Sequence, residues 1–345
     1  MNNIKKNICL VGAHSAGHIV PLITIAQKLR VITPEITITT CVGTKPLDYS
    51  LVKNIPWLTH TTHIPLNNPP RTISPRVWAL WIINCWISVW RTAYHLHCTQ
   101  PTEIITTGSI VALPVCLYAW ILRIPITLWE LNSEPGKTVN IISRFATHIN
   151  ICHPETQEQL PIKTRSRCML TPYPVRFTEE QINITTLEAR IKYHLDPQLY
   201  TIFILGGSQG SHALSSLTTR WIDSHPELWQ KLQVIHQTGY QETAHWISWY
   251  HTRSIVAHVF QYNSNIQELY SAADVIIARA GAGTLAEIVW AHKRAIIIPL
   301  ITAQTHHQQA NAQAYARKYP HSMTVLEQEK IAQNISILDN YFTIK

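Results

Sequence analysis

The chain has 345 residues and is 46% apolar, which is enough for two domains of ordinary size and excludes an intrinsically disordered protein. Its seven cysteines lie between Cys9 and Cys168 without any CxxC pair, which favours reduced thiols over a disulfide framework. The net charge of +8 is uneven, because residues 1–176 hold 16 basic against 7 acidic residues (+9) and residues 177–345 hold 12 against 13 (−1). The first half therefore favours an anionic partner such as a phospholipid surface, a pyrophosphate or a nucleic acid, against the plain alternative of scattered solvated charges.

Short β-rich runs alternate with segments long enough for helices along most of the chain. In the first half we expect strands within residues 7–12, 36–43, 103–108, 126–130 and 149–153. In the second half we expect them within residues 200–207, 232–239, 254–262, 275–281 and 294–300. Strands separated by helices form βαβ units, so the sequence predicts an α/β protein with two doubly wound parallel sheets.

The opening MNNIKKNICLVGAH has too short an apolar run for a signal peptide, and we expect it to hold the first strand. The stretch LTPYPVRF, residues 170–177, has two prolines and separates the two sets of strands. We therefore predict an N-terminal domain over residues 1–174, a C-terminal domain over 175–330 and a closing segment, possible as a helix, over 331–345. Two such domains facing one another would form a cleft at the carboxyl ends of their strands.

The first loop, in VGAHSAGHIVP at residues 11–21, has the frame of a phosphate-binding loop with a different ending. Four residues separate Gly12 from Gly17, but His18 and Ile19 follow where a triphosphate-binding loop has Lys and then Ser or Thr. The stretch is therefore either an ordinary strand-to-helix turn or a loop that handles a phosphate by other means.

A tryptophan-rich segment, RVWALWIINCWISVWR, runs from Arg76 to Arg91. Its apolar run is interrupted only by Asn84 and Ser88, and at 14 residues it is shorter than the ~20 that span a bilayer. A buried core helix is the plain interpretation. Because tryptophan favours membrane interfaces and arginines flank the segment, we predict reversible contact with anionic lipid.

Polar residues also follow the strand at residues 126–130, in the stretch ELNSEPGK. Asn132 at this strand end could reach an amide or hydroxyl of a ligand, and an Asx turn before a helix explains it equally well. Arg176, at the junction, is suitably placed for a phosphate; the plain alternative is a surface arginine.

Two glycine-containing loops follow strands of the second half. In FILGGSQGSHALSSL a strand ends at Leu205 and a helix is expected to start near Ser211, so that the N–H groups at its start and the Ser208 hydroxyl could bind a phosphate. In VIIARAGAGTLAEI, Glu287 lies early in a helix, where it either caps that helix or accepts hydrogen bonds from vicinal hydroxyls such as those of a ribose. Downstream, Gln308 and Asn311 share one helix face and could bind sugar hydroxyls, although a polar helix surface is the plainer interpretation.

Taken in order, these stretches resemble the MurG family of N-acetylglucosaminyltransferases, in glycosyltransferase family 28. The likeness rests on a first loop ending in GHIVP and on GGSQGS, RAGAGTLAEI and HQQANA, with ELNSEPGKTVN similar to the family's acceptor-domain motif and YPVR to its interdomain motif. It runs from about residue 8 to about residue 315. It implies a GT-B fold, with two Rossmann-like domains facing a cleft, and inverting transfer of GlcNAc from UDP-GlcNAc to the MurNAc hydroxyl of lipid I, which gives lipid II in peptidoglycan synthesis.

The resemblance also implies roles for individual residues. Ser208 and Arg176 would contact the UDP phosphates, Glu287 the ribose hydroxyls and Gln308 the GlcNAc hydroxyls. Asn132 would reach the donor sugar from the other domain, and the uracil position falls near Asn263, through backbone contacts. The loop that would line the nucleotide sugar comprises Ala282, Gly283, Thr284, Leu285 and Ala286, and the first loop contributes Ser15, Ala16, Gly17 and His18.

The first loop departs from the family pattern GGTGGH, since it reads Ala13, His14, Ser15, Ala16, Gly17, His18. A side chain at a position that requires a positive φ costs on the order of 1 kcal/mol or more, so we expect this loop to differ in shape. His18 is the candidate base for the acceptor hydroxyl, because an imidazole titrates near neutral pH, and a ligand-positioning or helix-capping histidine is the alternative.

No cofactor is expected to be obligatory, since the chain has no DxD-type acidic pair in a suitable loop; a divalent cation could assist at the acceptor pyrophosphate. The expected partners are UDP-GlcNAc, a lipid-linked acceptor and an anionic membrane surface, at the cytoplasmic face of the bacterial inner membrane. Two other functions stay open: another GT-B transferase with a lipid acceptor, and a catalytically idle relative that binds nucleotide sugar. A nucleic-acid-binding function rests on the basic charge alone and is not expected, because no motif of that kind is present.

Overall fold

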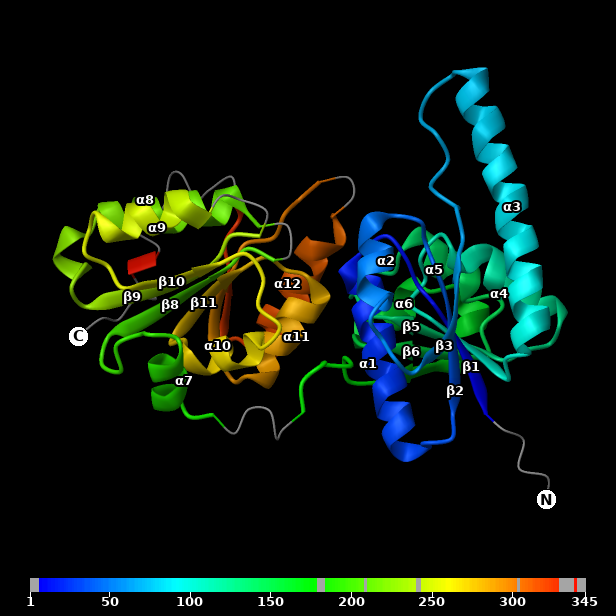
Figure 1. Cartoon of the computed structure of the whole chain (residues 1–345), viewed down its shortest axis with the longest axis horizontal. Helices are drawn as coiled ribbons and strands as arrows, with labels where there is room; N and C mark the ends of the chain where they lie inside the picture. The colour runs from blue at the N-terminus through cyan, green and yellow to red at the C-terminus, as the bar shows by residue number, and fades with distance from the viewer. Residues whose placement is uncertain are drawn as a thin grey trace. The chain divides into compact units, whose positions relative to one another are not determined.

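A computed structural model describes residues 6–178, 184–207, 210–239, 243–302, 305–328 and 338–339. The chain divides into two compact units, residues 1–176 and 177–345, and this division falls within the proline-containing stretch at residues 170–177. Each unit is built around one parallel sheet (Figure 1). The predicted α/β class with two doubly wound parallel sheets is confirmed.

The N-terminal unit holds a seven-stranded sheet in the order β3-β2-β1-β4-β5-β6-β7. The chain runs outward from β1 to β3, then returns to pair β4 beside β1, so the strand order reverses between β1 and β4. Its strands are β1 (Asn7–Val11), β2 (Thr37–Val42), β3 (Leu58–His63), β4 (Glu103–Thr106), β5 (Ile126–Glu130), β6 (His148–Ile151) and β7 (Cys168–Leu170). Its helices are α1 (Ala16–Ile32), α2 (Pro46–Val52), α3 (Pro75–Thr99), α4 (Ala112–Ile121), α5 (Lys137–Ile142) and α6 (Pro154–Gln159), with a 3-10 helix at Ile162–Arg167.

The C-terminal unit repeats this plan with six strands in the order β10-β9-β8-β11-β12-β13. The reversal of strand order now falls between β8 and β11, which pair directly. Its strands are β8 (Tyr200–Leu205), β9 (Leu232–Gln237), β10 (Ala257–Phe260), β11 (Val275–Ala278), β12 (Arg294–Ile297) and β13 (Met323–Val325). Its helices are α7 (Thr186–Lys192), α8 (His212–Asp223), α9 (Thr243–His251), α10 (Ile266–Ala272), α11 (Ala282–Trp290) and α12 (His307–Lys318), with a 3-10 helix at Pro226–Leu228.

The central strands are buried on both faces, and β8 (YTIFIL) and β11 (VIIA) accordingly read as largely apolar runs. Along β1, Cys9 and Val11 enter the core under α3, α4 and α5, whereas Ile8 and Leu10 enter the core under α1. Figure 1 shows these helices on the two faces of the N-terminal sheet. In the C-terminal unit, α8 and α9 cover one face with Trp221 and Tyr250 among their buried side chains.

The ten predicted strands are present, and three others were not predicted. These are β3, β7 and β13, and each lies at an edge of its sheet. An edge strand has one neighbour and less burial, so it needs no apolar run; β3 reads LTHTTH. Their short or polar sequences explain why pattern alone missed them.

Helix α3 departs from the plain interpretation of a buried core helix. The side chains that it buries are Ser88, Thr92, His95 and Leu96, while Trp86 and Trp90 are 66% and 74% exposed. Its first half projects from the rest of the N-terminal unit, beside the loop that leads into it (Figure 1). None of the helices in the described residues has the length and apolar character that crossing a bilayer requires.

The predicted closing segment at residues 331–345 lies outside the described residues except for two positions. Leu338 is buried in the core beneath α8 and α9, and the Asp339 carboxylate accepts a hydrogen bond from the Trp221 indole, at 2.7 Å. These two contacts attach this part of the chain to the C-terminal unit.

Candidate active site

The candidate residues of the C-terminal unit gather at the carboxyl edge of its sheet. The loops after β8 and β11 leave neighbouring strands, because Leu205 and Ala278 are partners in the β8–β11 register. The Arg279 side chain joins the two loops, because its Nε donates to Ser211 Oγ at 3.1 Å. Its Nη1 donates to the Ile298 carbonyl, directly after β12, at 3.0 Å. In open α/β sheets, ligands bind at this reversal point of the strand order.

The loop after β8 has the glycines that its path requires. Gly207 and Gly210 have φ values of 77° and 75°, in the left-handed region that glycine adopts without strain. A Cβ atom at Gly206 would lie 2.8 Å from the Gln237 carbonyl oxygen. Helix α8 then begins after Ser211, whose Oγ accepts a hydrogen bond from the Leu214 N–H, so the predicted helix start is confirmed. Ser208 lies outside the described residues.

The loop after β11 leads directly into α11, which begins at Ala282 after its N-cap Gly281. Ala282, Gly283 and Thr284 are half-buried and form the first turn, whose N–H groups have no partner within the helix. The Leu285 and Ala286 side chains, by contrast, are buried in the unit, and the Leu285 N–H donates to the Gly281 carbonyl. Ala282, Gly283 and Thr284 are therefore better placed than Leu285 and Ala286 to contact a ligand.

Glu287 is half-buried on α11 and is held by a residue that sequence reasoning missed. The Tyr270 hydroxyl, from α10, donates to Glu287 Oε2 at 2.9 Å. Tyr270 itself is buried against Phe203 and Phe177. Its tyrosine type carries no distinctive signal, so only the packing of α10 against the sheet identifies it.

Three further polar residues of this unit take part in local hydrogen bonds. Gln308 Oε1 accepts from the Leu300 N–H at 3.0 Å, which holds the start of α12 against the loop after β12. Asn311 is buried, and its Nδ2 donates to the Ala280 carbonyl, so it supports the loop after β11 rather than facing solvent. Asn263, after β10, accepts through Oδ1 from the Asn265 N–H at 2.8 Å.

The candidate residues of the N-terminal unit also lie at the carboxyl edge of a sheet, around the reversal point between β1 and β4. Helix α1 begins at Ala16 after Ser15, and Gly17 is exposed in its first turn. His18 follows, and its Nδ1 lies 3.3 Å from Thr107 Oγ1 in the loop after β4. The structure thus joins the first loop to the loop after β4.

The hydrogen bonds of Thr107 fix the tautomer of His18. The Thr107 hydroxyl donates to the His18 carbonyl at 3.1 Å, so its oxygen must accept from Nδ1–H of the same histidine. With the proton on Nδ1, the lone pair lies on Nε2, which is the nitrogen that could accept a proton. Thr107 is therefore a positioning residue for the candidate base.

The backbone of the first loop shows which of its non-glycine residues lies in the left-handed region. Among Ala13, His14 and Ala16, only His14 has a positive φ, at 72°. Its N–H donates to the buried carboxylate of Asp48 at 2.7 Å, and its Nε2 lies 3.1 Å from the Leu66 carbonyl oxygen. These contacts offset the strain of one non-glycine residue in the left-handed region.

Asn132 lies in a loop that wraps around the carboxylate of Glu130. Glu130 is 2% exposed and accepts from the Asn132 N–H at 2.9 Å, from Asn132 Nδ2 at 3.0 Å and from the Gly136 N–H at 3.2 Å. Burial raises the pKa of Glu130 to about 7, against the opposing effect of these donors. Glu130 thereby orients the Asn132 side chain. An Asx turn before a helix would not by itself require this contact with a buried carboxylate.

Arg176 is half-buried at the end of the N-terminal unit, directly before Phe177. The candidate residues are therefore distributed over two sheet edges, one in each unit. His18, Asn132 and the first loop belong to the N-terminal edge, and the remaining described candidates, Arg176 apart, belong to the C-terminal edge.

Comparison with known proteins covers both units. Residues 8–151 match the glycosyltransferase family 28 N-terminal domain, and residues 201–339 match the family's C-terminal domain. Relatives named UDP-N-acetylglucosamine--N-acetylmuramyl-(pentapeptide) pyrophosphoryl-undecaprenol N-acetylglucosamine transferase include one from Thermobifida fusca, 30% identical over 85% of this chain and 74% of that protein. Another, from Thermodesulfovibrio yellowstonii, is 32% identical over 61% of this chain, and the match spans 57% of that relative's length.

A solved structure similar to this chain is the MurG of Acinetobacter baumannii. It has a TM-score of 0.68 and 22% identity, with 98% of this chain and 90% of that chain covered. This likeness, with the two all-parallel sheets, shows the GT-B fold.

Proposed function

We propose, from the fact that this chain belongs to glycosyltransferase family 28, that it transfers N-acetylglucosamine from UDP-N-acetylglucosamine to the MurNAc hydroxyl of a lipid-linked acceptor. The acceptor is lipid I, undecaprenyl-pyrophosphoryl-MurNAc-pentapeptide, and the product is lipid II. Both domains of the family are matched, and the relatives' names state this reaction. The observation that carries the proposal is that the candidate residues, Arg176 apart, lie at the carboxyl edges of the two sheets.

The donor would bind at the C-terminal edge. The start of α8 and Arg176 would stabilise the UDP phosphates, together with Ser208, since N–H groups and a guanidinium favour negative charge. Glu287, oriented by Tyr270, would accept hydrogen bonds from the ribose hydroxyls. The first turn of α11 and Gln308 would meet the sugar, and backbone groups near Asn263 the uracil.

The transfer would proceed by one displacement at C1 of GlcNAc, with inversion. The MurNAc hydroxyl that attacks must lose a proton, and His18 Nε2 would accept it. Asn132 would orient the donor sugar from the N-terminal unit. The charge on the leaving UDP is met by the groups above, so the proposal requires no obligatory metal, and a divalent cation at the acceptor pyrophosphate is an optional addition.

A turnover assay tests the reaction. Purified protein is incubated with UDP-GlcNAc and a short-chain lipid I analogue, with diacylglycerol as the competing acceptor. We expect transfer to the lipid I analogue only. Transfer to diacylglycerol alone would instead support a glycolipid synthase, and UDP-GlcNAc binding without transfer to either acceptor would support an idle relative.

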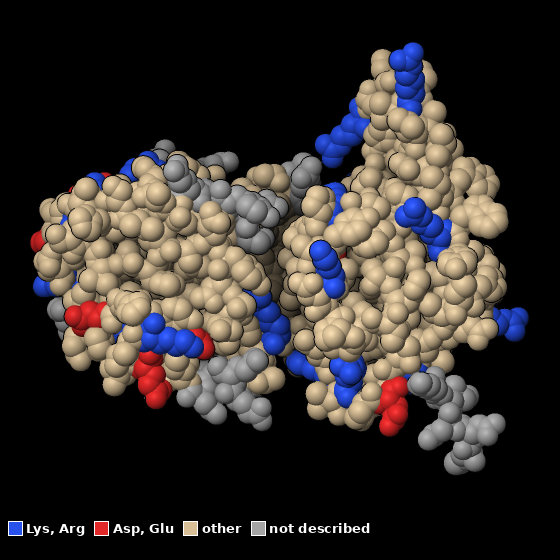
Figure 2. Space-filling model, in the orientation of Figure 1, with Lys and Arg blue, Asp and Glu red and all other residues tan. Residues whose placement is uncertain are grey.

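Helix α3 would place the enzyme on its acceptor's membrane, as a peripheral protein at the cytoplasmic face of the inner membrane. Its outward side chains include Trp78, Trp86 and Trp90, and the neighbouring α4 adds Trp120. No acidic residue occurs in the sequence between Asp48 and Glu103, whereas Arg71, Arg76 and Arg91 flank the tryptophans. Figure 2 shows the projecting part as a largely uncharged surface with basic side chains toward its tip.

An apolar surface with basic flanks fits an anionic bilayer, because tryptophan partitions to the interface and arginine attracts anionic headgroups. Sedimentation with liposomes tests this proposal. We expect binding that rises with the anionic lipid fraction and weakens with salt. Equal binding to neutral and anionic liposomes would contradict it.

A further inference from the structure

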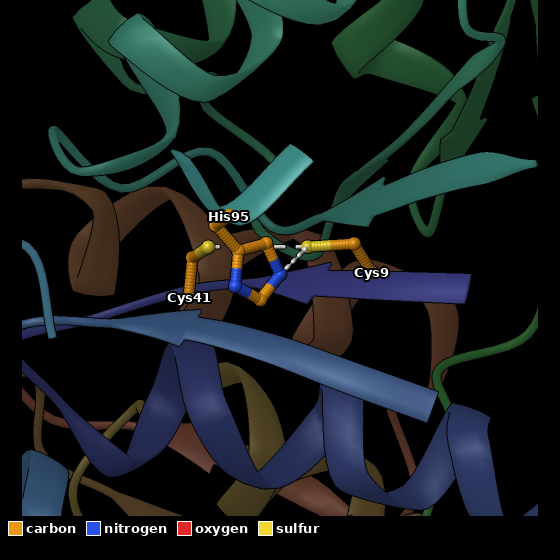
Figure 3. Close-up of side chains that lie close together, drawn as sticks. All are labelled: Cys9, Cys41 and His95. Atoms are coloured by element: carbon orange, nitrogen blue, oxygen red, sulfur yellow. Dashed lines mark hydrogen bonds between the residues drawn. The ribbon is translucent and has the colours of Figure 1, made fainter. Parts of the chain in front are cut away.

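Three side chains of metal-ligating types meet in the core of the N-terminal unit, between the sheet and helix α3. Cys9 comes from β1, Cys41 from β2 and His95 from the second half of α3. All three are fully buried, with 0% of each residue exposed. Figure 3 shows the two sulfur atoms and the imidazole ring close together between the strands and the helix.

The parallel register places the two thiols on the same face of the sheet. In this register Cys9 pairs with Thr39 and Val11 pairs with Cys41. Cys41 is therefore two residues beyond the partner of Cys9 along β2. Side chains two residues apart along a strand point to the same face. Both thiols therefore point toward α3, and the helix brings His95 over them.

Two distances between the donor atoms, both from Cys9 Sγ, match those of a zinc site. Cys9 Sγ lies 3.9 Å from Cys41 Sγ and 3.4 Å from His95 Nε2, and all three donor atoms lie within 4.8 Å of one another. Tetrahedral zinc, with bonds of about 2.3 Å to sulfur and about 2.0 Å to nitrogen, separates two sulfurs by about 3.8 Å and sulfur from nitrogen by about 3.5 Å. A single ion could therefore contact these atoms with little movement of the side chains.

The imidazole of His95 is oriented as a metal ligand is. Its Nδ1 lies 2.8 Å from Thr62 Oγ1 on β3, which leaves Nε2 turned toward the thiols. Ligating histidines generally hydrogen-bond through the other ring nitrogen, which fixes the tautomer and the ring plane. Thr39 Oγ1 also lies close to this nitrogen, at 3.2 Å from Nε2.

The charge of this donor set suits a divalent ion in a dry core. Two thiolates and a neutral imidazole carry a charge of −2, so a zinc complex is neutral and a buried net charge is avoided. Binding replaces two S–H bonds with two Zn–S bonds and releases two protons, with no change of oxidation state.

We propose that Cys9, Cys41 and His95 form a structural zinc site that ties helix α3 to strands β1 and β2. The site lies under the buried half of α3, whose other half carries the exposed tryptophans. Structural zinc contributes directly to folding stability, so the ion would anchor the projecting helix to the sheet. The inference stands on this core alone and does not depend on the transferase reaction.

Metal content tests the proposal on the full chain. The protein is expressed in zinc-supplemented medium, dialysed against EDTA to strip surface-bound metal, and analysed by inductively coupled plasma mass spectrometry. We expect one zinc per chain, retained because the site is fully buried. Expression in cobalt-supplemented medium should give the intense thiolate-to-cobalt absorption in the near ultraviolet that oxygen and nitrogen ligands alone do not produce.

Matched variants assign the site. Cys41→Ala and His95→Gln should lose the zinc and the cobalt band, whereas Cys116→Ala, which removes an equally buried thiol from the same core, should retain both. Zinc-free wild-type protein would overturn the proposal, and so would a Cys41→Ala variant that binds cobalt as the wild type does. A disulfide between Cys9 and Cys41, seen as the loss of two hydrogen atoms in the intact mass and located by peptide mapping, would overturn it as well.

Discussion

Thr107 and His18 exchange hydrogen bonds across the reversal point of the N-terminal sheet, and this pair gives the first prediction at the residue scale. Replacing Thr107 by Val removes the group that holds the proton on Nδ1, so the turnover number should fall about tenfold to a hundredfold. The KM for UDP-GlcNAc should change little, because Thr107 lies in the other unit. Steady-state kinetics over a range of pH measure both effects.

The Thr107→Ser variant is the matched control, since it keeps the hydroxyl. It should restore most of the turnover number and the wild-type pH profile. If Thr107→Ser is as impaired as Thr107→Val, the hydroxyl does not position His18 and only packing is involved.

His14 gives a prediction about backbone strain. Both His14→Gly and His14→Ala lose the contact with the Leu66 carbonyl, but only glycine adopts the φ of 72° without steric cost. The alanine variant should therefore have a free energy of unfolding about 1 kcal/mol lower than that of the glycine variant. Urea denaturation measures the difference, and equal stabilities would show that the loop relaxes to another conformation.

Glu130 gives a prediction about pH. Because burial raises its pKa to about 7, the folded chain binds this proton more tightly than the unfolded chain does. Its stabilising contribution is complete at low pH and is lost as the pH rises toward and through 7. Between about pH 5 and about pH 8 the wild type should lose on the order of 1–3 kcal/mol more stability than Glu130→Gln does.

Denaturant titrations of the two proteins across this pH range provide the measurement. The same slope of stability against pH in both proteins would mean that Glu130 is ionised throughout.

At the scale of elements, α3 shows why an apolar segment need not be a core segment. Its apolar run covers residues 77–90, but the residues that it buries are Ser88, Thr92, His95 and Leu96, mostly beyond the run. The spacing of these four residues is that of one helix face. Composition alone identified the segment, but not the direction in which its tryptophans point.

The exposed face of α3 predicts the effect of removing two tryptophans. Trp86→Ser combined with Trp90→Ser should lower the affinity for anionic liposomes by at least about tenfold, because each indole loses its apolar contact with the bilayer. The free energy of unfolding should change by no more than about 1 kcal/mol, since both side chains are exposed. Liposome sedimentation and thermal denaturation measure the two quantities.

A control that also removes exposed apolar side chains comes from the C-terminal unit. Ile191→Ser with Ile247→Ser alters two exposed residues there and should leave liposome binding unchanged. If this pair weakens binding as much as the tryptophan pair does, α3 has no special role.

At the scale of the whole molecule, the two units should be separable by mutation. Glu287→Gln should weaken UDP-GlcNAc binding about tenfold or more and leave liposome binding intact, because it affects only the C-terminal edge. His18→Asn should abolish transfer and leave both kinds of binding intact. Isothermal titration with UDP-GlcNAc, liposome sedimentation and the turnover assay distinguish the three properties.

Near wild-type transfer by His18→Asn would show that another group is the base. Loss of UDP-GlcNAc binding in the same variant would show that His18 belongs to the donor site instead.

The sequence by itself determined the central strands, the α/β class and the stretch that separates the units. Strands buried on both faces appear as apolar runs, and the loops after them often contain glycine. Both patterns can be read from a short stretch of sequence. The sequence also selected Glu287, Asn132 and His18, since each follows a strand at a helix start or loop. The edge strands β3, β7 and β13 lacked such a signal, because an edge position imposes less burial.

Only the tertiary structure decided which residues support the candidates and where the side chains of α3 point. Tyr270 reaches Glu287 from a different helix, and Thr107 reaches His18 across 89 residues of chain. Cys9, Cys41 and His95 likewise meet only through strand register and the packing of α3 on the sheet. Contacts between residues distant in sequence depend on how the elements pack, and the local pattern of a single sequence carries no record of that packing.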